Sequence, residues 1–206
     1  MNIEAIVVGA FQENCIVVWG ELNQAIIIDP GSEPDAILNL LAQRHLDVAA
    51  YMLTHGHMDH ISALAARHEA RPAPIGLHAL DQSWAFAETN QLPPYGIPAE
   101  PVQIERSLAE GQTWEDGGLT YNVIETPGHT PGGVCFHFPE HKALIVGDTL
   151  FAGSVGRTDF PGGDSRVLKA SLSRLRTLDD DLVVYPGHGP TTTIGYEKQT
   201  NFFMQG

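Results

Sequence analysis

The sequence predicts an α/β (α+β) fold in four layers, in which two mixed β-sheets pack face to face and helices cover both outer faces (αββα). Each half of the chain, about 1–100 and about 101–206, reads as strands, then a helix, then a strand that ends in a histidine-bearing loop. With 206 residues, 43% of them hydrophobic, the chain can bury such a core as one domain, 1–206. No literal repeat relates the two halves, so only this order of elements suggests a duplication.

The first half opens with segments rich in β-branched residues and separated by turn residues, which predicts strands at 3–8, 15–19 and 25–28. Apolar residues at 37, 38, 40 and 41 have helical spacing and predict a helix over 33–44. The later elements expected here are a buried strand at 49–54, a helix from about residue 60, a strand at 74–78 and an irregular, lid-like segment at 79–100.

The second half repeats this order. Its predicted elements are strands at 119–125, 134–138 and 143–146, a helix at 167–178 and a last strand at 182–185. The last strand leads into His188, much as the strand at 49–54 leads into His55. Both halves therefore deliver a histidine from the end of a buried strand.

The charge of the chain restricts its partners. The formal net charge is -14, from 25 acidic and 11 basic side chains. Such a surface repels phosphate backbones and anionic lipid, so we expect no nucleic acid partner and no membrane partner. Bound divalent cations would offset part of this charge locally. The expected partner is a small-molecule substrate, and the sequence leaves open whether the protein also binds another protein.

Both cysteines and the N-terminal residues indicate the compartment. Cys15 and Cys135 lie in apolar, strand-like contexts, which predicts buried free thiols and a reducing compartment. The N-terminal residues show no basic region followed by an apolar one, so we expect no signal peptide. No apolar run approaches the ~20 residues of a membrane span. The expected location is the cytoplasm.

The strongest chemical signal is the stretch Thr54 to His60, which reads THGHMDH. In an extended loop His55 and His57 are two residues apart and can face the same side. Asp59 and His60 follow as a helix begins, so their side chains can turn to a neighbouring point. Imidazole and carboxylate groups are ligands that Zn, Fe and Mn accept. The stretch therefore predicts two groups of metal ligands a few ångströms apart.

Three other strand ends carry an ionisable residue between glycine and proline. His129 lies in TPGHTPGG, Asp148 follows the apolar strand that ends in VGDT, and His188 lies in PGHGP. Each feature alone is weak, but loops at strand ends commonly hold catalytic groups in layered folds. Together with the first stretch they predict a metal-dependent hydrolase.

The other five histidines do not fit this pattern. We expect three of them to be exposed helix or turn residues, namely His45, His68 and His141. The remaining two lie on predicted strands and are expected to be structural groups: His78 and His137.

With these residues the chain resembles the metallo-β-lactamase superfamily over nearly its whole length. THGHMDH matches the HxHxDH signature of that family, and His129, Asp148 and His188 match its three later ligand positions in order. The resemblance is greatest to the short bacterial type II glyoxalases, which are hydroxyacylglutathione hydrolases. The stretches that carry it also include FQENC, DPG, GDTLFAGSVGRTDFPGGD and PGHGPTTTIGYE.

The resemblance implies a site with two divalent ions, with zinc expected and iron or manganese possible. One ion would take His55, His57 and His129, and the other Asp59, His60 and His188. The carboxylate of Asp148 would bridge the two, so that Asp59 and Asp148 are also the expected catalytic residues. The implied reaction is attack of a metal-bridging hydroxide on a thioester, S-lactoylglutathione, which yields lactate and glutathione.

The sequence departs from the longer glyoxalases in two ways. Gly56 stands where they carry a further histidine, which is not itself a ligand, and only 18 residues follow His188, where they carry a helical region that contacts glutathione. An alternative is a persulfide dioxygenase, a class that shares the fold and a GRTDF-like stretch. It would use one iron held by two histidines and a carboxylate, which could here be His55, His129 and Asp148. A non-enzymatic metal-binding module is a further alternative, although a structural site closes around its ion with fewer ligands.

Two residues are candidates for substrate contact. Arg157 follows the Asp148 loop and could hold a substrate carboxylate, or it could form a buried brace with Asp159 that fixes the loop. Tyr196 is the other candidate, with ordinary packing near the C-terminus as the alternative.

Overall fold

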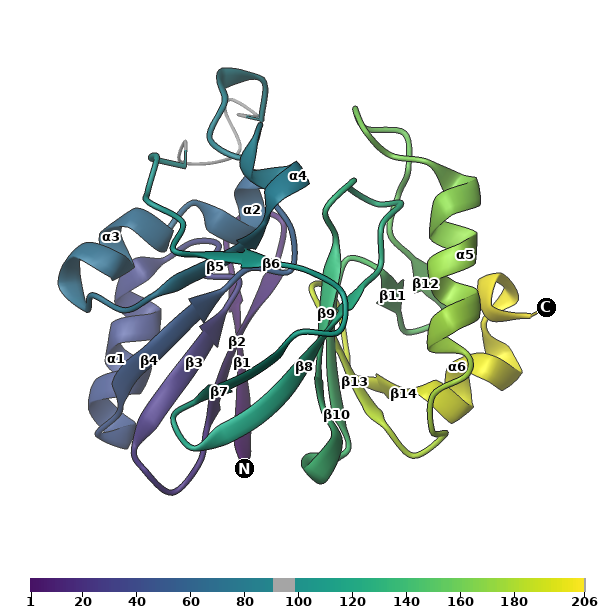
Figure 1. Cartoon of the computed structure of the whole chain (residues 1–206). Helices are drawn as coiled ribbons and strands as arrows, with labels where there is room; N and C mark the ends of the chain where they lie inside the picture. The colour runs from purple at the N-terminus through teal and green to yellow at the C-terminus, as the bar shows by residue number, and fades with distance from the viewer. Residues whose placement is uncertain (91–98, 206) are drawn as a thin grey trace.

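The computed structural model describes residues 1–90 and 99–205, which form two six-stranded mixed sheets (Figure 1). The first sheet has the strand order β1-β2-β3-β4-β5-β6 and the second the order β14-β13-β10-β9-β8-β7. The strands of the first sheet are Asn2–Val8, Glu13–Trp19, Gln24–Ile28, Asp47–Met52, Ile75–His78 and Arg106–Leu108. In chain order from β7 to β10, followed by β13 and β14, those of the second are Thr113–Asp116, Leu119–Glu125, Val134–Phe138, Ala143–Gly147, Val183–Pro186 and Thr192–Thr193.

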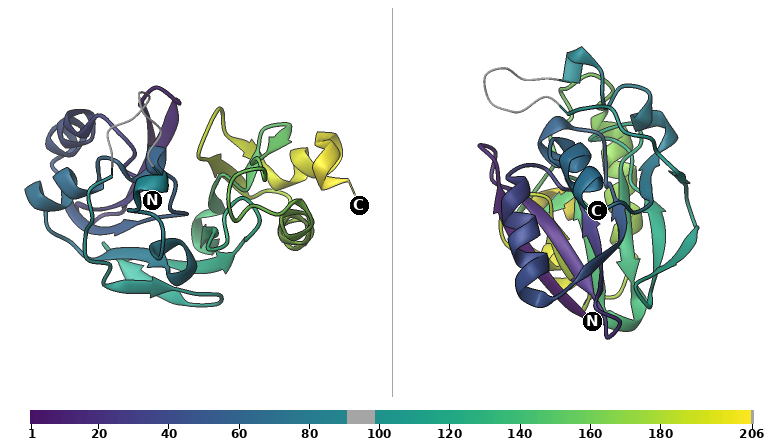
Figure 2. Two further views of the ribbon diagram at one scale, coloured as in Figure 1. Left: turned by 90° about the horizontal axis from the view of Figure 1, so that it is seen from above. Right: turned by 90° about the vertical axis from the view of Figure 1, so that its left-hand side faces the viewer.

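Helices cover the outer face of each sheet, as the view from above in Figure 2 shows. On the first sheet these include α1 (Pro34–Arg44) and α3 (Leu64–Ala70), and on the second α5 (Ser165–Leu175) and α6 (Ile194–Thr200). The short elements are α2 (Met58–Ile61), α4 (Ala79–Gln82), the 3-10 helices η1 (Glu88–Asn90), η2 (Pro139–His141) and η3 (Phe202–Met204), and the hairpin β11 (Leu150–Phe151) and β12 (Ser154–Val155). Within the described residues, no helix has the length and apolar character needed to cross a membrane.

The alternation of side chains along the strands produces the four layers. In β2, Ile16 and Val18 face the second sheet, where they share a buried cluster with Phe136. The intervening Val17 faces the other way and packs in the cluster that contains Leu41 of α1. A third cluster joins the outer face of the second sheet to α5 and α6. The αββα architecture predicted from the sequence is therefore confirmed.

Helix α5, which covers the second sheet, begins where its sequence provides an N-terminal cap. The side chain of Asp164 accepts hydrogen bonds from the backbone N–H groups of Arg166 and Val167, which starts α5 two residues before the predicted position. Buried leucines at 168, 172 and 175 then face the sheet.

Most predicted elements appear within two or three residues of their expected bounds, but several differ. The helix expected from about residue 60 is two short helices, α2 and α3. In the segment expected to be irregular, α4 and η1 are helical, and 91–98 lie outside the described residues. The short strands β6, β7 and β14 and the helix α6 have no counterpart in the prediction, because their apolar patterns are too short to be recognised. The assignment of 1–206 to one domain stays a prediction.

Candidate metal centre

Five chain segments bring the seven predicted ligand residues together between the two sheets. His55 and His57 lie directly after β4, and Asp59 and His60 lie on α2. The second sheet supplies the remaining three from the loops after β8, β10 and β13, namely His129, Asp148 and His188. Five of the seven are therefore held shortly after a strand, and the other two, Asp59 and His60, on the short helix that follows β4.

The donor atoms form two compact groups. One ligand atom from each of His55, His57 and His129 lies within 4.8 Å of the others, and the same holds for Asp59, His60 and His188. Such a spacing allows three donors to reach a single ion.

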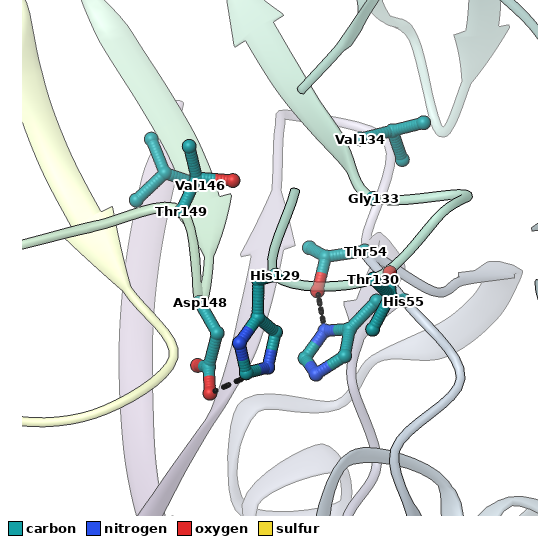
Figure 3. A pocket seen from close by; sticks show the side chains of 9 residues that line it. All are labelled: Thr54, His55, His129, Thr130, Gly133, Val134, Val146, Asp148 and Thr149. Carbon is teal, nitrogen blue, oxygen red and sulfur yellow. Dashed lines mark hydrogen bonds and ion pairs between the residues drawn. The ribbon is translucent and has the colours of Figure 1, made fainter. Parts of the chain in front are cut away.

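Asp148 lies between these two groups. Its Oδ1 is 3.5 Å from Nε2 of His60, and its Oδ2 is 3.4 Å from Nε2 of His129 and 3.6 Å from Nε2 of His188. Figure 3 shows the carboxylate pointing toward the ring of His129, with the ring of His55 alongside. One carboxylate thus contacts both groups of donors, as a bridging ligand must.

The backbone and neighbouring side chains fix which nitrogen of each ring faces the site. Nδ1 of His60 is 3.0 Å from Asp29, and Nδ1 of His129 is 2.7 Å from the carbonyl of Arg157. In the same way His188 Nδ1 lies 3.1 Å from the carbonyl of Phe11. An acceptor at Nδ1 holds the proton there and leaves Nε2 as a lone-pair donor, which is the arrangement typical of metal-ligating histidines.

His55 and His57 complete the set in two different ways. Nδ1 of His55 is 3.0 Å from the Thr54 hydroxyl, so its Nε2 faces the site. His57 instead presents Nδ1, which lies 2.9 Å from Nε2 of His129.

Unpaired buried atoms test whether metal ions fit this site. Among the described residues, the buried side-chain atoms without a hydrogen-bond partner include Nε2 of His55, Nε2 of His60 and Oδ1 of Asp148; the others belong to Glu13 and Arg67. The three atoms at this site are the ones that bear on metal binding. A buried polar atom without a partner costs about 1–3 kcal/mol, and such atoms are rare. All three belong to the two donor groups or lie between them. The donor set therefore fits divalent ions, which would satisfy these atoms at once.

The charge environment differs between the two groups. Burial lowers the pKa of His55, and burial together with His129 lowers the pKa of His57 to about 3. Burial also opposes protonation of His60 and His188, but nearby carboxylates, among them Asp148, outweigh it and raise the pKa of both histidines above the usual range. The His60 group is thus the more negative of the two.

Three buried carboxylates behind the ligands were not among the predicted site residues: Glu13, which lies 3.8 Å from Nδ1 of His60, Asp29 and Asp81. Asp29 accepts hydrogen bonds from the backbone N–H and the hydroxyl of Thr54, in addition to its contact with His60. One oxygen of Asp29 also lies within 4.8 Å of a ring nitrogen of His55 and of His60, so Asp29 contacts one ligand of each donor group. Asp81 accepts bonds from the N–H groups of Gly56 and Gly132 and from the hydroxyl of Thr130. The Asp29-Pro30-Gly31 turn, which ends β3, was the sequence signal for Asp29; Asp81 lies in α4 and gave none.

Arg157 forms an ion pair with Asp159, but this pair is not the buried brace that the sequence suggested. Both nitrogen–oxygen contacts measure 2.7 Å, whereas the two side chains are 56% and 68% exposed. The guanidinium also lies 3.9 Å from the centre of the Phe160 ring, which in turn contacts the ring of His57. Arg157 therefore lies at the rim of the site with its charge already paired.

Tyr196 lies on α6 with 58% of its surface exposed. Its backbone N–H donates a hydrogen bond to the hydroxyl of Thr193, and its carbonyl accepts one from the hydroxyl of Thr200. A role for it in substrate binding stays a prediction.

The remaining histidines and both cysteines lie outside the donor groups. His45 ends α1 and is exposed, and His141 is exposed in η2, as expected, whereas His68 is partly buried against Tyr51. His78 contacts Glu125 and His137 lies half-buried on β9. Both cysteines are free and buried, which confirms that prediction.

Fold and site together define a metal-binding αββα protein with two candidate ion positions between its sheets. The family model described as the metallo-beta-lactamase superfamily matches residues 8–188. The hydroxyacylglutathione hydrolase GloC of Haemophilus influenzae is 37% identical over 212 residues, which cover 99% of this chain and 98% of that protein. The chain therefore belongs to the metallo-β-lactamase superfamily.

Two solved structures agree with this assignment. The B3 metallo-beta-lactamase BLEG-1 superposes with a TM-score of 0.93 at 34% identity and covers 100% of both chains. TTHA1623, in a di-iron-bound form, superposes with a TM-score of 0.88 at 40% identity and covers 97% of this chain and 99% of that one.

Proposed function

We propose that this protein is a metal-dependent thioester hydrolase that cleaves S-lactoylglutathione to lactate and glutathione. The position of the Asp148 carboxylate between the two donor groups supports it most directly, because a shared carboxylate is suited to a pair of ions. The similarity to a hydroxyacylglutathione hydrolase over the full chain supports the substrate class. Zinc is the proposed ion, with iron and manganese as alternatives that the same donors accept.

The residues of the site have separate parts in this reaction. His55, His57 and His129 would hold one ion, Asp59, His60 and His188 the other, and Asp148 both. The bound ions would lower the pKa of a water molecule toward ~7 and polarise the thioester carbonyl. The carboxylate of Asp59, which is only partly buried, lies 3.4 Å from Nε2 of His188 and would orient the attacking water by accepting a hydrogen bond from it. No separate proton donor is needed for the leaving thiolate, since its thiol has a pKa of ~8.5.

The opposite pKa shifts of two pairs of ligand histidines lead to a pH prediction. A histidine must lose its proton to bind a metal, so affinity falls once the pH drops below its pKa in the ion-free protein. The pKa is raised at His60 and His188 and lowered at His55 and His57. As the pH falls, the ion at the His60 group should therefore leave first. It should leave at a pH near or above about 6.5, the ordinary pKa of histidine.

Zinc competition titrations at several pH values between about 8 and about 5.5 measure this order, since that interval spans the ordinary histidine pKa. Two binding steps should be resolved, and at the acidic end only the step that belongs to the His60 group should be lost. Simultaneous loss of both ions, or earlier loss at the His55 group, would contradict the assignment of ligands to the two ions.

A substrate panel tests the reaction class. We expect the zinc-loaded protein to hydrolyse S-lactoylglutathione and to lose this activity in chelator. A β-lactam and glutathione persulfide should be turned over far more slowly, and without uptake of oxygen. Oxygen-dependent turnover of the persulfide by a one-iron form, with no thioester hydrolysis, would identify the protein as a persulfide dioxygenase instead.

A further inference from the structure

The turn that carries His188 belongs to the second sheet, but a residue of the first sheet holds it. Asn14, near the start of β2, donates its backbone N–H to the carbonyl of Gly187 at 2.7 Å. Its side-chain amide donates to the carbonyls of Pro186 and Gly189 at 3.0 and 2.9 Å. Because the amide has two hydrogens, both are used, and one residue binds the backbone on either side of His188.

The neighbouring residues of the same segment add contacts to His188 itself. The carbonyl of Phe11 lies 3.1 Å from Nδ1 of His188, and Glu13 forms an isolated antiparallel bridge with the backbone of His188. Residues 11–14 therefore determine both where the turn lies and which way the imidazole points.

The turn has little space in which to shift once it is held there. A side chain at Gly187 would bring its Cβ to 2.3 Å from Oδ1 of Asp148 and 2.7 Å from Cε1 of His60. The backbone thus packs directly against two of the residues with which His188 would share an ion. A small displacement of the turn would change the position of Nε2 relative to Asp59, which is 3.4 Å away.

Ligands of the other group are held by different contacts. The loop of His55 and His57 is bound by Asn90, whose side chain donates to the carbonyl of Gly56 at 2.8 Å, and by Asp81. His129 is oriented by the carbonyl of Arg157. Among the described residues, the ligand-bearing loop that Asn14 contacts through hydrogen bonds is the turn of His188.

We propose that Asn14 is a positioning residue for the second ion: it holds the His188 turn across the two sheets and so sets the affinity of the Asp59, His60 and His188 group. This inference rests on the two-ion site of the proposed function. Residues that orient a metal ligand from behind typically change metal affinity by about 10- to 100-fold when they are replaced. We expect a loss of this size at the second ion and less than about a threefold change at the first, because the hydrogen bonds of the Asn14 side chain go to the His188 turn and Asp148, not this turn, links the two donor groups.

Zinc titration against a competing chelator measures both affinities in the purified full chain. Asn14→Ala removes the side-chain donors, and Asn14→Asp removes them while keeping the size of the side chain. Asn201→Ala is the matched control, because Asn201 is also a buried asparagine and its amide donates to the carbonyls of Phe151 and Ser154. Thermal unfolding of the ion-free proteins is measured in parallel to compare their stability.

Both Asn14 variants should weaken the second zinc step selectively, while Asn201→Ala should lower the unfolding temperature and leave both steps in place. If either folded Asn14 variant binds two ions as tightly as the unchanged protein, or weakens both equally, the inference is wrong. If the unchanged protein binds only one ion, the proposed two-ion function fails, and the inference fails with it.

Discussion

Replacement of Asp148 by alanine is expected to reduce thioester hydrolysis by more than about 100-fold. Loss of a residue that only orients a metal ligand costs less, whereas Asp148 itself contacts the donor groups. Its two carboxylate oxygens lie 3.4 to 3.6 Å from histidines of both groups. The variant should therefore bind both ions more weakly, and not one alone. Turnover of S-lactoylglutathione and the zinc content of the purified variant measure the two effects.

Two other variants make this result specific. His188→Ala should lose one ion and retain much of the binding at the other, because His188 belongs to one donor group only. Asp181→Ala should change neither quantity, since Asp181 is an exposed aspartate paired with Lys142. If Asp148→Ala keeps one ion at full affinity, Asp148 does not act as a bridge. If His188→Ala is as active as the unchanged protein, the assignment of His188 to a second, required ion is wrong.

The second large effect is expected at Asp81, which joins the loops of two ligand segments. Its fully buried carboxylate accepts three hydrogen bonds, from Gly56 beside His55 and from Thr130 and Gly132 beside His129. Asp81→Ala leaves these three donors buried and unpaired, at a cost of roughly 1–3 kcal/mol each. We expect the free energy of unfolding to fall by about 3 kcal/mol or more, and the affinity for the first ion to fall with it.

Urea unfolding of the ion-free protein and zinc titration check both parts. Asp81→Asn keeps one acceptor oxygen at nearly the same volume, so its loss of stability should be smaller than that of the alanine variant. Equal stability of Asp81→Ala and the unchanged protein would show that the three donors find other partners.

The sequence could predict the ligand residues because their signal is local. Asp59 and His60 are adjacent, His55 follows a buried strand, and Gly and Pro flank His129 and His188. The layers could be predicted for a similar reason, since alternating β-branched residues reveal the strands of a core.

The contacts that hold these ligands could not be predicted, because they join residues far apart in the chain. Asn14 binds the turn of His188 from 172 to 175 positions away, and Asp81 binds Gly132 across 51 positions. A lone Asn or Asp carries no pattern that identifies its partner. The exposure of Arg157 was misjudged for a related reason: the sequence shows the adjacent Asp159 but not whether the loop lies on the surface.

The most direct test of the two-ion hydrolase is the rate of S-lactoylglutathione hydrolysis as zinc is added to the ion-free protein. Activity should rise until two ions are bound for each chain, with little activity at the first ion, and it should be lost again in chelator. Full activity at one ion for each chain, or activity that persists in chelator, would contradict the two-ion hydrolase.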